Sequence, residues 1–301
     1  MGTECKLTVL TPTYNRVAKL PELLESLVRQ TNKNFQWLVI DDGSQDKTQE
    51  WFSEVLKKDL GFQIDYYVKE NGGKHTALNF SHQYIKGDYV VVVDSDDVLT
   101  ENAAEDIIHT WSKYAHRVDV KMIVFQKAYK DVADIPMDSM FSNGEIESTL
   151  VAMTNSGMRG DHCETVKTDD FIRFDFPVFE GEKFIGEAWL WQKIAEDGCT
   201  IFVNRVLYLC EYLENGLSKS GRALRIKNPL GGMEHARIFL NKKFKFKIRM
   251  KQAVLYSCYS LFAKENLIKM LRSFGDSKLV VLLSYPLGLV VYLYWKKKYC
   301  K

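Results

Sequence analysis

The stretch "YVVVVDSDDVLT", residues 89–100, joins four valines to three acidic residues, Asp94, Asp96 and Asp97. A short run of β-branched residues predicts a buried strand. The carboxylates come where that strand ends, and like charges a few ångströms apart repel each other at the low-dielectric edge of a sheet. We therefore expect a bound cation at this strand end, with a solvated acidic turn as the alternative.

Similar apolar runs alternate with amphipathic stretches through the first 130 residues. Leu20, Leu23 and Leu27 fall on one face of a helix within residues 18–30, and residues 102–114 repeat the pattern. This alternation predicts an α/β fold with a mostly parallel sheet flanked by helices on both faces. The expected strands are residues 6–11, 35–41, 63–69, 88–94 and 120–126.

Ligands of such a sheet bind beyond the carboxyl ends of the strands. Polar turns at residues 11–16, 41–46 and 70–79 each follow an expected strand and should meet the acidic turn at one edge. Each also has a simpler explanation: Asp46 could be the N-cap of a helix, and Lys74 a surface charge beside two turn glycines. Acidic oxygens suit Mg²⁺ or Mn²⁺, which keep positions open for phosphates. This edge therefore points to a nucleotide-linked substrate.

Four motifs then occur in a characteristic order: "LTVLTPTYNR", "FQWLVIDDGSQDKT", "NGGKHTALN" and "VVVVDSDDVL". Together they resemble the inverting family 2 glycosyltransferases of GT-A fold, a Rossmann-like architecture. The resemblance is close over residues 5–130 and weaker to about residue 215. It implies a nucleotide-sugar site made by Pro12, Tyr14, Asn15, Arg16, Asp42, Lys74, Asn79, Asp94 and Ser95.

Two roles in that implied site concern acidic residues. By resemblance, Asp42 accepts a hydrogen bond from the base, which favours uracil although guanine carries an N–H there too. Asp94-Ser95-Asp96 corresponds to the D-x-D signature, with Asp96 on a Mn²⁺ or Mg²⁺ ion. Asp97 is the remaining acid, and the choice of inner metal ligand between Asp96 and Asp97 stays open.

An inverting transferase needs a general base on the face of the anomeric carbon opposite the leaving diphosphate. The segment "EGEKFIGEAWLWQKI" offers Glu180, Glu182 and Glu187, and the resemblance favours Glu187, the acid that opens a helix. The alternative is that Glu187 only complements the helix dipole. Asp161 and His162 resemble residues on the acceptor side, although a loop histidine is as often structural.

The C-terminal third differs from the rest in charge. Residues 216–301 hold 19 Lys/Arg against 3 Asp/Glu, a balance of +16, whereas residues 1–215 hold 22 against 36, a balance of −14. We therefore divide the chain into a catalytic region, 1–215, and a basic, mainly helical region, 216–301, that associates with membrane or acceptor. The apolar stretch 279–295 is at the short limit for a span, so we expect it to lie in the interface of an anionic membrane. Packing on the domain itself, or a homo-oligomer contact, is the alternative.

These features combine into one hypothesis, a metal-dependent enzyme that moves a sugar from a nucleotide donor to a lipid-linked glycan in cell-surface polysaccharide synthesis. Six cysteines without a CxxC pair, and no signal segment before the first strand, favour a cytoplasmic enzyme peripheral to the inner face of the membrane. Alternatives are a nucleotidyltransferase acting on a sugar phosphate and a non-catalytic glycan- or membrane-binding scaffold. The sequence has no nucleic-acid-binding motif, so we expect no nucleic-acid partner.

Overall fold

A computed structural model of the chain describes residues 5–133, 135–138, 144–158, 160–211, 221–266 and 277–300. The chain divides into two compact units. The sheet unit comprises Met1–Leu150, Met158–Asp175 and Lys193–Glu211. The helical unit comprises Val151–Gly157, Phe176–Gln192 and Tyr212–Lys301. Two segments that precede residue 215 in the sequence therefore belong with the C-terminal helices.

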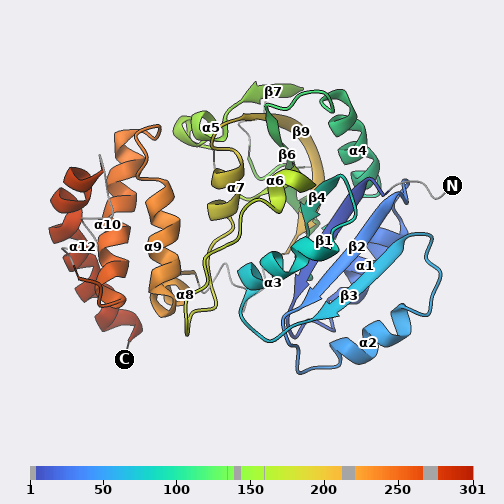
Figure 1. The fold of residues 1–301 in the computed structure, drawn as a ribbon, viewed down its shortest axis with the longest axis horizontal. Helices are drawn as coiled ribbons and strands as arrows, with labels where there is room; N and C mark the ends of the chain where they lie inside the picture. The colour runs from blue at the N-terminus through green and yellow to red at the C-terminus, as the bar shows by residue number, and fades with distance from the viewer. Residues whose placement is uncertain are drawn as a thin grey trace. The chain divides into compact units, whose positions relative to one another are not determined.

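Four parallel strands form the half of the sheet that begins at the N-terminus (Figure 1). They are β1 (Leu7–Thr13), β2 (Phe35–Asp41), β3 (Gln63–Val68) and β4 (Tyr89–Val92), in the order β3-β2-β1-β4. Thr13 pairs with Asp41, and Asp41 pairs with Val68, so these three strands end level with one another. The loops that follow them start at the same edge, as the sequence predicts.

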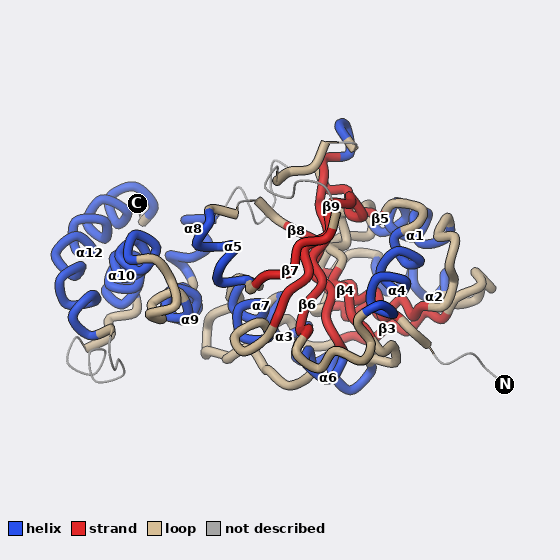
Figure 2. The backbone as a smooth tube through the Cα atoms, turned by 90° about the horizontal axis from the view of Figure 1, so that it is seen from above, coloured by secondary structure: helices blue, strands red, loops and turns tan. Residues whose placement is uncertain are grey.

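The sheet continues beyond β4 through strands of mixed direction, and Figure 2 shows them in red. These strands are β5 (Val98–Leu99), β6 (Val120–Tyr129), β7 (Glu145–Ser148), β8 (His162–Lys167) and β9 (Cys199–Cys210). β8 inserts between β4 and β6 and is antiparallel to both, whereas β6 and β9 pair in parallel. β5 and β7 each pair with β9 in antiparallel fashion. The expected parallel sheet is thus confirmed, with antiparallel strands added in its second half.

Helices pack on the sheet because they bury one apolar stripe each. Side chains of α1, α2 and α4 join one core cluster with those of the strands, including Leu23, Phe52, Trp111, Val9 and Trp37. α3 packs on β1 and β2, and the short α6 packs on β4 and β8. The helices are α1 (Leu20–Val28), α2 (Thr48–Val55), α3 (Lys74–Ser81), α4 (Ala103–Lys113) and α6 (Thr168–Phe171). Short 3-10 turns are η1 (His82–Tyr84) and η2 (Lys130–Val132).

The helical unit has its own core, built around Met233, Tyr256, Tyr259, Val281 and Trp295. The expected mainly helical C-terminal region is confirmed. Its helices are α8 (Gly221–Lys227), α9 (Pro229–Ile238), α10 (Phe246–Phe262) and α12 (Lys278–Tyr299). Two short helices, α5 (Leu150–Ser156) and α7 (Ala188–Ile194), lie where the chain passes from one unit to the other.

Candidate functional site

The loops after β1 and β2 are joined by Asn15. Its backbone adopts a left-handed conformation, with φ of 52°, which asparagine tolerates better than most residues. The Asn15 N–H donates to Ser44 Oγ at 2.9 Å, and Asn15 Oδ1 accepts from the Gln45 N–H at 2.7 Å. Asp46 adds a third link, because it accepts from the Val17 N–H at 3.1 Å and from the Thr48 N–H at 3.0 Å. Asp46 precedes the N-cap residue Lys47, so it lies one position earlier than expected.

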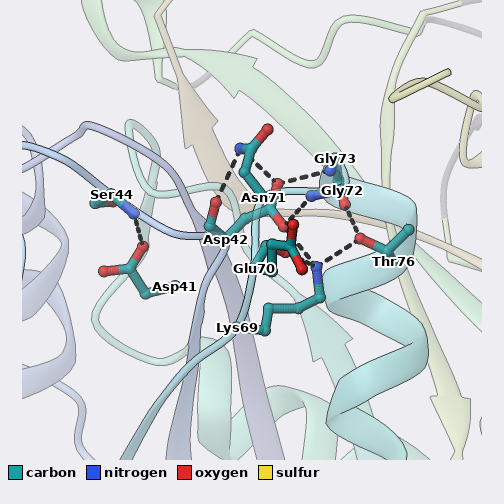
Figure 3. A network of polar contacts seen from close by, with 9 residues as sticks. All are labelled: Asp41, Asp42, Ser44, Lys69, Glu70, Asn71, Gly72, Gly73 and Thr76. Carbon is teal, nitrogen blue, oxygen red and sulfur yellow. Dashed lines mark hydrogen bonds and ion pairs between the residues drawn. The ribbon is translucent and has the colours of Figure 1, made fainter. Parts of the chain in front are cut away.

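Asp42 joins the loop after β2 to the loop after β3 (Figure 3). Its Oδ1 accepts from Lys69 Nζ at 2.8 Å and from the Gly72 N–H at 2.9 Å. Its Oδ2 accepts from Asn71 Nδ2 at 3.1 Å and from the Gly73 N–H at 2.7 Å. A carboxylate has about four acceptor positions, and all are used within the chain. In this conformation Asp42 therefore organises the loop, and a nucleotide base would have to share or displace one of these donors.

Gly43 allows this close packing of the two loops. Its φ of 77° is strained for any residue with a side chain, and an added Cβ would lie 3.1 Å from both the Asn71 nitrogen and the Lys69 oxygen. Gly73 is similar in conformation, with φ of 95°, and precedes the first residue of α3, Lys74. Gly43 of "DDGS" and Gly73 of "NGGKH" are thus required by backbone geometry.

The three carboxylates after β4 point to three different partners. Lys74 Nζ donates to Asp94. Asp96 lies 3.8 Å from the Arg16 guanidinium, and its side chain is partly exposed. Asp97 is buried and accepts from the Tyr208 hydroxyl at 2.8 Å.

Cations of the chain offset this acidic cluster. Lys127 of β6 packs over the Tyr208 ring, 3.8 Å from its centroid. Burial alone would lower the pKa of Lys127, but the carboxylates of Glu164, Asp94 and Asp97 raise it above its usual value. Burial works against ionisation of Asp94, yet Lys74 and Lys127 outweigh it and lower the pKa of Asp94. Part of the charge balance that we expected from a bound ion is therefore supplied by the protein itself.

Asp97 behaves differently from its neighbours. Burial, with the negative charge of Asp94, raises the pKa of Asp97 to about 7. Its partner Tyr208 also accepts from the Asp94 N–H at 2.9 Å, so one hydroxyl holds both ends of the acidic turn. The pKa of Tyr208 is raised well above its usual value, because the ring is buried and faces Asp94 and Asp97.

The acidic turn can be tested for its fit to a divalent ion. Among the described residues, no group of three His, Cys, Asp or Glu side chains is arranged to hold a metal. Mg²⁺ and similar ions are usually held by one or two carboxylates and by phosphate oxygens rather than by an all-protein cage. Asp96, with its partly exposed carboxylate, fits that pattern, whereas Asp97 is occupied by Tyr208. The donor chemistry thus fits an ion held jointly by the protein and a diphosphate.

The remaining residues of the predicted nucleotide site differ in exposure. Pro12 is buried inside β1, opposite Ile40, whereas Tyr14 is exposed. Ser95 is buried in the acidic turn, and Asn79 is half-buried on α3. Tyr14 is thus the most accessible of these four side chains.

The two residues expected on the acceptor side differ in their surroundings. Asp161 is exposed just before β8. His162 is buried, and its Nε2 lies 3.3 Å from Asp138 Oδ2. Burial lowers the pKa of His162, although Asp138 opposes that effect. A role for His162 toward an acceptor would require this pair to open.

The three candidates for the general base lie in the helical unit and are not equivalent. Glu182 caps α9: its two carboxylate oxygens accept from the Leu230 and Gly231 N–H groups, each at 2.8 Å. Glu180 is exposed. Glu187 is half-buried at the start of α7, where its carbonyl oxygen accepts from the Leu190 N–H at 2.8 Å. Glu182 therefore has a structural task, and Glu187 is the candidate that opens a helix.

The segment that carries Glu187 is fixed to α9 at two points besides Glu182. The Lys183 N–H donates to Asn228 Oδ1 at 2.7 Å. Gly186 lies against the half-buried His235, because a Cβ added there would be 3.1 Å from His235 Nδ1. The segment preceding Glu187 is thus braced by one helix of its own unit.

Sequence reasoning missed Tyr208, Lys127 and Lys69, which organise the acidic turn and the loop after β3. Tyr208 and Lys127 lie on strands far from the acidic turn in the sequence, and a local pattern carries no signal for such contacts. Lys69 had a weak signal, because it immediately precedes the polar turn "ENGGKH".

Two sequence relatives are informative. The profile described as Glycosyl transferase family 2 matches residues 8–163. Glycosyltransferase GlyA of Streptococcus pneumoniae serotype 4 is 36% identical over 244 residues, which are 75% of this chain and 31% of that protein. Minor teichoic acid biosynthesis protein GgaB of Bacillus subtilis is 28% identical over 141 residues, 46% of this chain and 16% of that protein. The chain spans less than two thirds of the length of the curated relatives that it matches.

Two solved structures share the fold. Staphylococcus aureus TarS 1–349 in complex with UDP-GlcNAc has a TM-score of 0.65 at 18% identity, over 93% of this chain and 79% of that one. The mannosyltransferase PcManGT of Pyrobaculum calidifontis, in complex with GDP-Man and Mn²⁺, has a TM-score of 0.58 at 18% identity, over 98% and 83%. At these identities the likeness shows the GT-A fold.

Proposed function

The chain belongs to glycosyl transferase family 2, and we propose that it is an inverting hexosyltransferase that uses a UDP-linked sugar. The observation that carries this proposal is the edge where Arg16, Asp42, Lys74 and the acidic turn 94–97 come together. It provides cations for a diphosphate and carboxylates for the ion that accompanies it. The UDP-GlcNAc bound by TarS supports a uridine donor, whereas the GDP-Man bound by PcManGT keeps guanosine as the alternative.

Different residues of this edge would bind different parts of the nucleotide-sugar donor. Tyr14 is exposed in the loop after β1 and would stack on the base. Lys74 and Arg16 each pair with an acidic residue of the turn and would neutralise diphosphate oxygens. Asp96 would hold Mn²⁺ or Mg²⁺, and Asp97 would become a second ligand only by giving up its hydrogen bond from Tyr208. When bound, that ion supplies stabilisation for charge on the leaving diphosphate. The Mn²⁺ bound by PcManGT supports this assignment.

Transfer with inversion needs a single displacement. The acceptor hydroxyl oxygen attacks the anomeric carbon while its proton passes to the Glu187 carboxylate, which acts as general base. The new carbon–oxygen bond forms as the bond from the anomeric carbon to the diphosphate oxygen breaks, and the nucleoside diphosphate leaves with that electron pair. No covalent intermediate between sugar and protein is required.

We further propose that the acceptor is a lipid-linked glycan in cell-surface polysaccharide synthesis, met at the cytoplasmic face of the membrane. The support is the relationship to GgaB, which is named for teichoic acid biosynthesis, together with the basic region 216–301. Asp161 would contact the acceptor more readily than the buried His162. Within this scheme residues 1–215 hold the donor, and residues 216–301 approach the acceptor or the membrane.

The test is hydrolysis of a panel of nucleotide sugars with Mn²⁺ present. Release of free sugar from one UDP-sugar supports the transferase. Pyrophosphate released from a nucleoside triphosphate in the presence of a sugar phosphate would support a nucleotidyltransferase instead. No turnover of any donor, with glycan or membrane binding intact, would support a scaffold.

A further inference from the structure

Helix α12 carries a broad apolar surface that faces away from the helical unit's own core. Within the described residues it is the one helix long and apolar enough to cross a membrane. No charged residue occurs between Lys278 and Lys296. Exposed fractions run from 40% to 64% for Leu279, Leu282, Leu283, Leu287, Leu289, Val290, Leu293 and Tyr294. Exposed apolar surface of this extent marks an interaction site.

The opposite side of α12 packs against α10. Val281, Ser284, Gly288 and Trp295 are buried on the side toward α10. A Cβ added at Gly288 would lie 2.5 Å from Ser257 Cβ, so the two helices touch backbone to backbone there. α12 is therefore half of a packed helix pair, which differs from a lone span that would present apolar residues on all sides.

Cations flank the apolar surface at both ends of the helix pair. Ser277 donates to the Leu240 carbonyl before α10 begins, and Tyr292 contacts Phe262 where α10 ends, so the two helices run in the same direction. One end therefore carries Lys278 together with the exposed cations Lys245, Lys247 and Lys251 from the start of α10. The other end carries Lys296, Lys297 and Lys298, all exposed.

We propose that the exposed face of α12, from Leu279 to Tyr294, docks on an anionic lipid leaflet with the helix lying along the membrane plane. Both cationic ends can contact the same layer of headgroups only in that orientation, because a spanning helix would carry one end to the far leaflet. Leucine and valine side chains then enter the acyl boundary, and Tyr294 lies at headgroup depth. A second copy of the chain would match the apolar face but not the lysines at both ends, since like charges would oppose each other. This docking deepens the proposed function, because a lipid-linked acceptor lies in such a membrane, but its test requires no sugar transfer.

The test is sedimentation of the full chain with vesicles of phosphatidylglycerol and phosphatidylcholine in equal amounts, and with phosphatidylcholine alone. We expect binding to the anionic vesicles that weakens as salt rises. The double variant Leu283→Glu, Leu287→Glu should lose at least about thirtyfold in vesicle affinity, from lost apolar burial. The triple variant Lys296→Gln, Lys297→Gln, Lys298→Gln should lose about a hundredfold at low salt, at roughly 1 kcal/mol per lysine.

Val118→Glu, Ile135→Glu is the matched control, because Val118 and Ile135 are 80% and 62% exposed in the sheet unit and receive the same two charges. It should bind vesicles as the wild type does. Urea unfolding, measured in all variants, verifies folding without reference to the donor, and Mn²⁺-dependent UDP binding, measured separately, tests the donor assignment. Unchanged vesicle binding in the double leucine variant overturns the proposal. A lipid-free dimer that this variant converts to monomer, without wild-type vesicle binding, overturns it in favour of a second copy.

The orientation of α12 relative to the membrane is tested by a separate measurement, the quenching of tryptophan fluorescence. A tryptophan introduced by Leu287→Trp lies at the middle of the helix, and lipids brominated at known depths quench its fluorescence accordingly. A helix along the membrane plane predicts shallow quenching, equal to that of Leu279→Trp at the helix start. Deep quenching at the middle with shallow quenching at the start overturns the in-plane orientation.

Discussion

Replacing Tyr208 by phenylalanine tests whether the acidic turn is held in place by a residue of a distant strand. The substitution removes one hydroxyl and leaves the ring, which is buried, where it is. Two hydrogen bonds disappear, one from the Asp94 N–H at 2.9 Å and one to Asp97 Oδ2 at 2.8 Å. The Asp94 N–H loses its acceptor, and the buried Asp97 keeps only the longer hydrogen bond from the Glu211 N–H, at 3.4 Å.

The magnitude follows from those two losses. An unpaired buried donor costs about 1–3 kcal/mol, and a hydrogen bond to a charged group contributes about 1.5–3 kcal/mol. Because neighbouring groups can shift to satisfy part of the lost bonding, the two costs do not add in full. We expect the free energy of unfolding to fall by about 2–4 kcal/mol. The turn that presents Asp96 would also become less ordered, and we expect Mn²⁺-dependent UDP affinity to fall at least about tenfold.

Urea unfolding measures the first effect and calorimetric titration of UDP with Mn²⁺ measures the second. Tyr256→Phe is the control, because it also removes a buried tyrosine hydroxyl, the partner of Arg237 in the helical unit, at 3.2 Å. That variant should lose stability and keep its UDP affinity. Loss of stability with unchanged UDP affinity in Tyr208→Phe would refute the positioning role.

Two further predictions concern the helical unit and pH. Glu187→Gln should preserve UDP binding and lower transfer by about a hundredfold or more, the usual contribution of a general base. Glu182→Gln should instead lower the unfolding free energy by about 1–2 kcal/mol through its cap on α9, and equal effects of the two variants on transfer would contradict the distinction. Burial lowers the pKa of His75 and of His235 to about 4, from about 6.5 in the unfolded chain. As pH falls from 6.5 toward 4, the unfolded chain therefore binds protons that the folded chain does not, and each histidine removes up to about 3 kcal/mol of stability. Asp97, with its raised pKa, acts in the opposite direction over the same range, so the measurement is the difference in urea unfolding between wild type and His235→Gln at pH 7 and pH 4.5. If the difference in unfolding free energy between wild type and His235→Gln is the same at pH 7 and pH 4.5, the lowered pKa of His235 is contradicted.

The sequence predicted the parallel half of the sheet and the shared edge of its loops. Apolar runs of four to seven residues are visible locally, and parallel strands necessarily end on one side. It did not predict that β8 inserts in antiparallel direction beside β4, because pairing between residues such as Val90 and Val166 leaves no trace in either local pattern.

The sequence predicted which residues form the site better than it predicted which residues they contact. The motifs indicated Asp42 and the acidic turn, but not that Asp42 accepts four hydrogen bonds from its own chain, or that Tyr208 and Lys127 hold Asp94 and Asp97. Those partners are set by strand order, and the same holds for the cap that Glu182 provides to α9 from 48 residues away. The assignment of catalysis to residues 1–215 and of membrane or acceptor association to residues 216–301 stays a prediction.

Calorimetric titration of UDP into the wild type and into Asp96→Ala, each with and without Mn²⁺, tests the central claim that the acidic turn binds the donor diphosphate together with a divalent ion. We expect Mn²⁺ to strengthen UDP binding to the wild type at least about tenfold and to leave Asp96→Ala unaffected, since the variant lacks the partly exposed ligand. The unfolding free energy without metal should change little. Mn²⁺ enhancement of equal size in the two proteins, or no UDP binding to the wild type, would contradict the account.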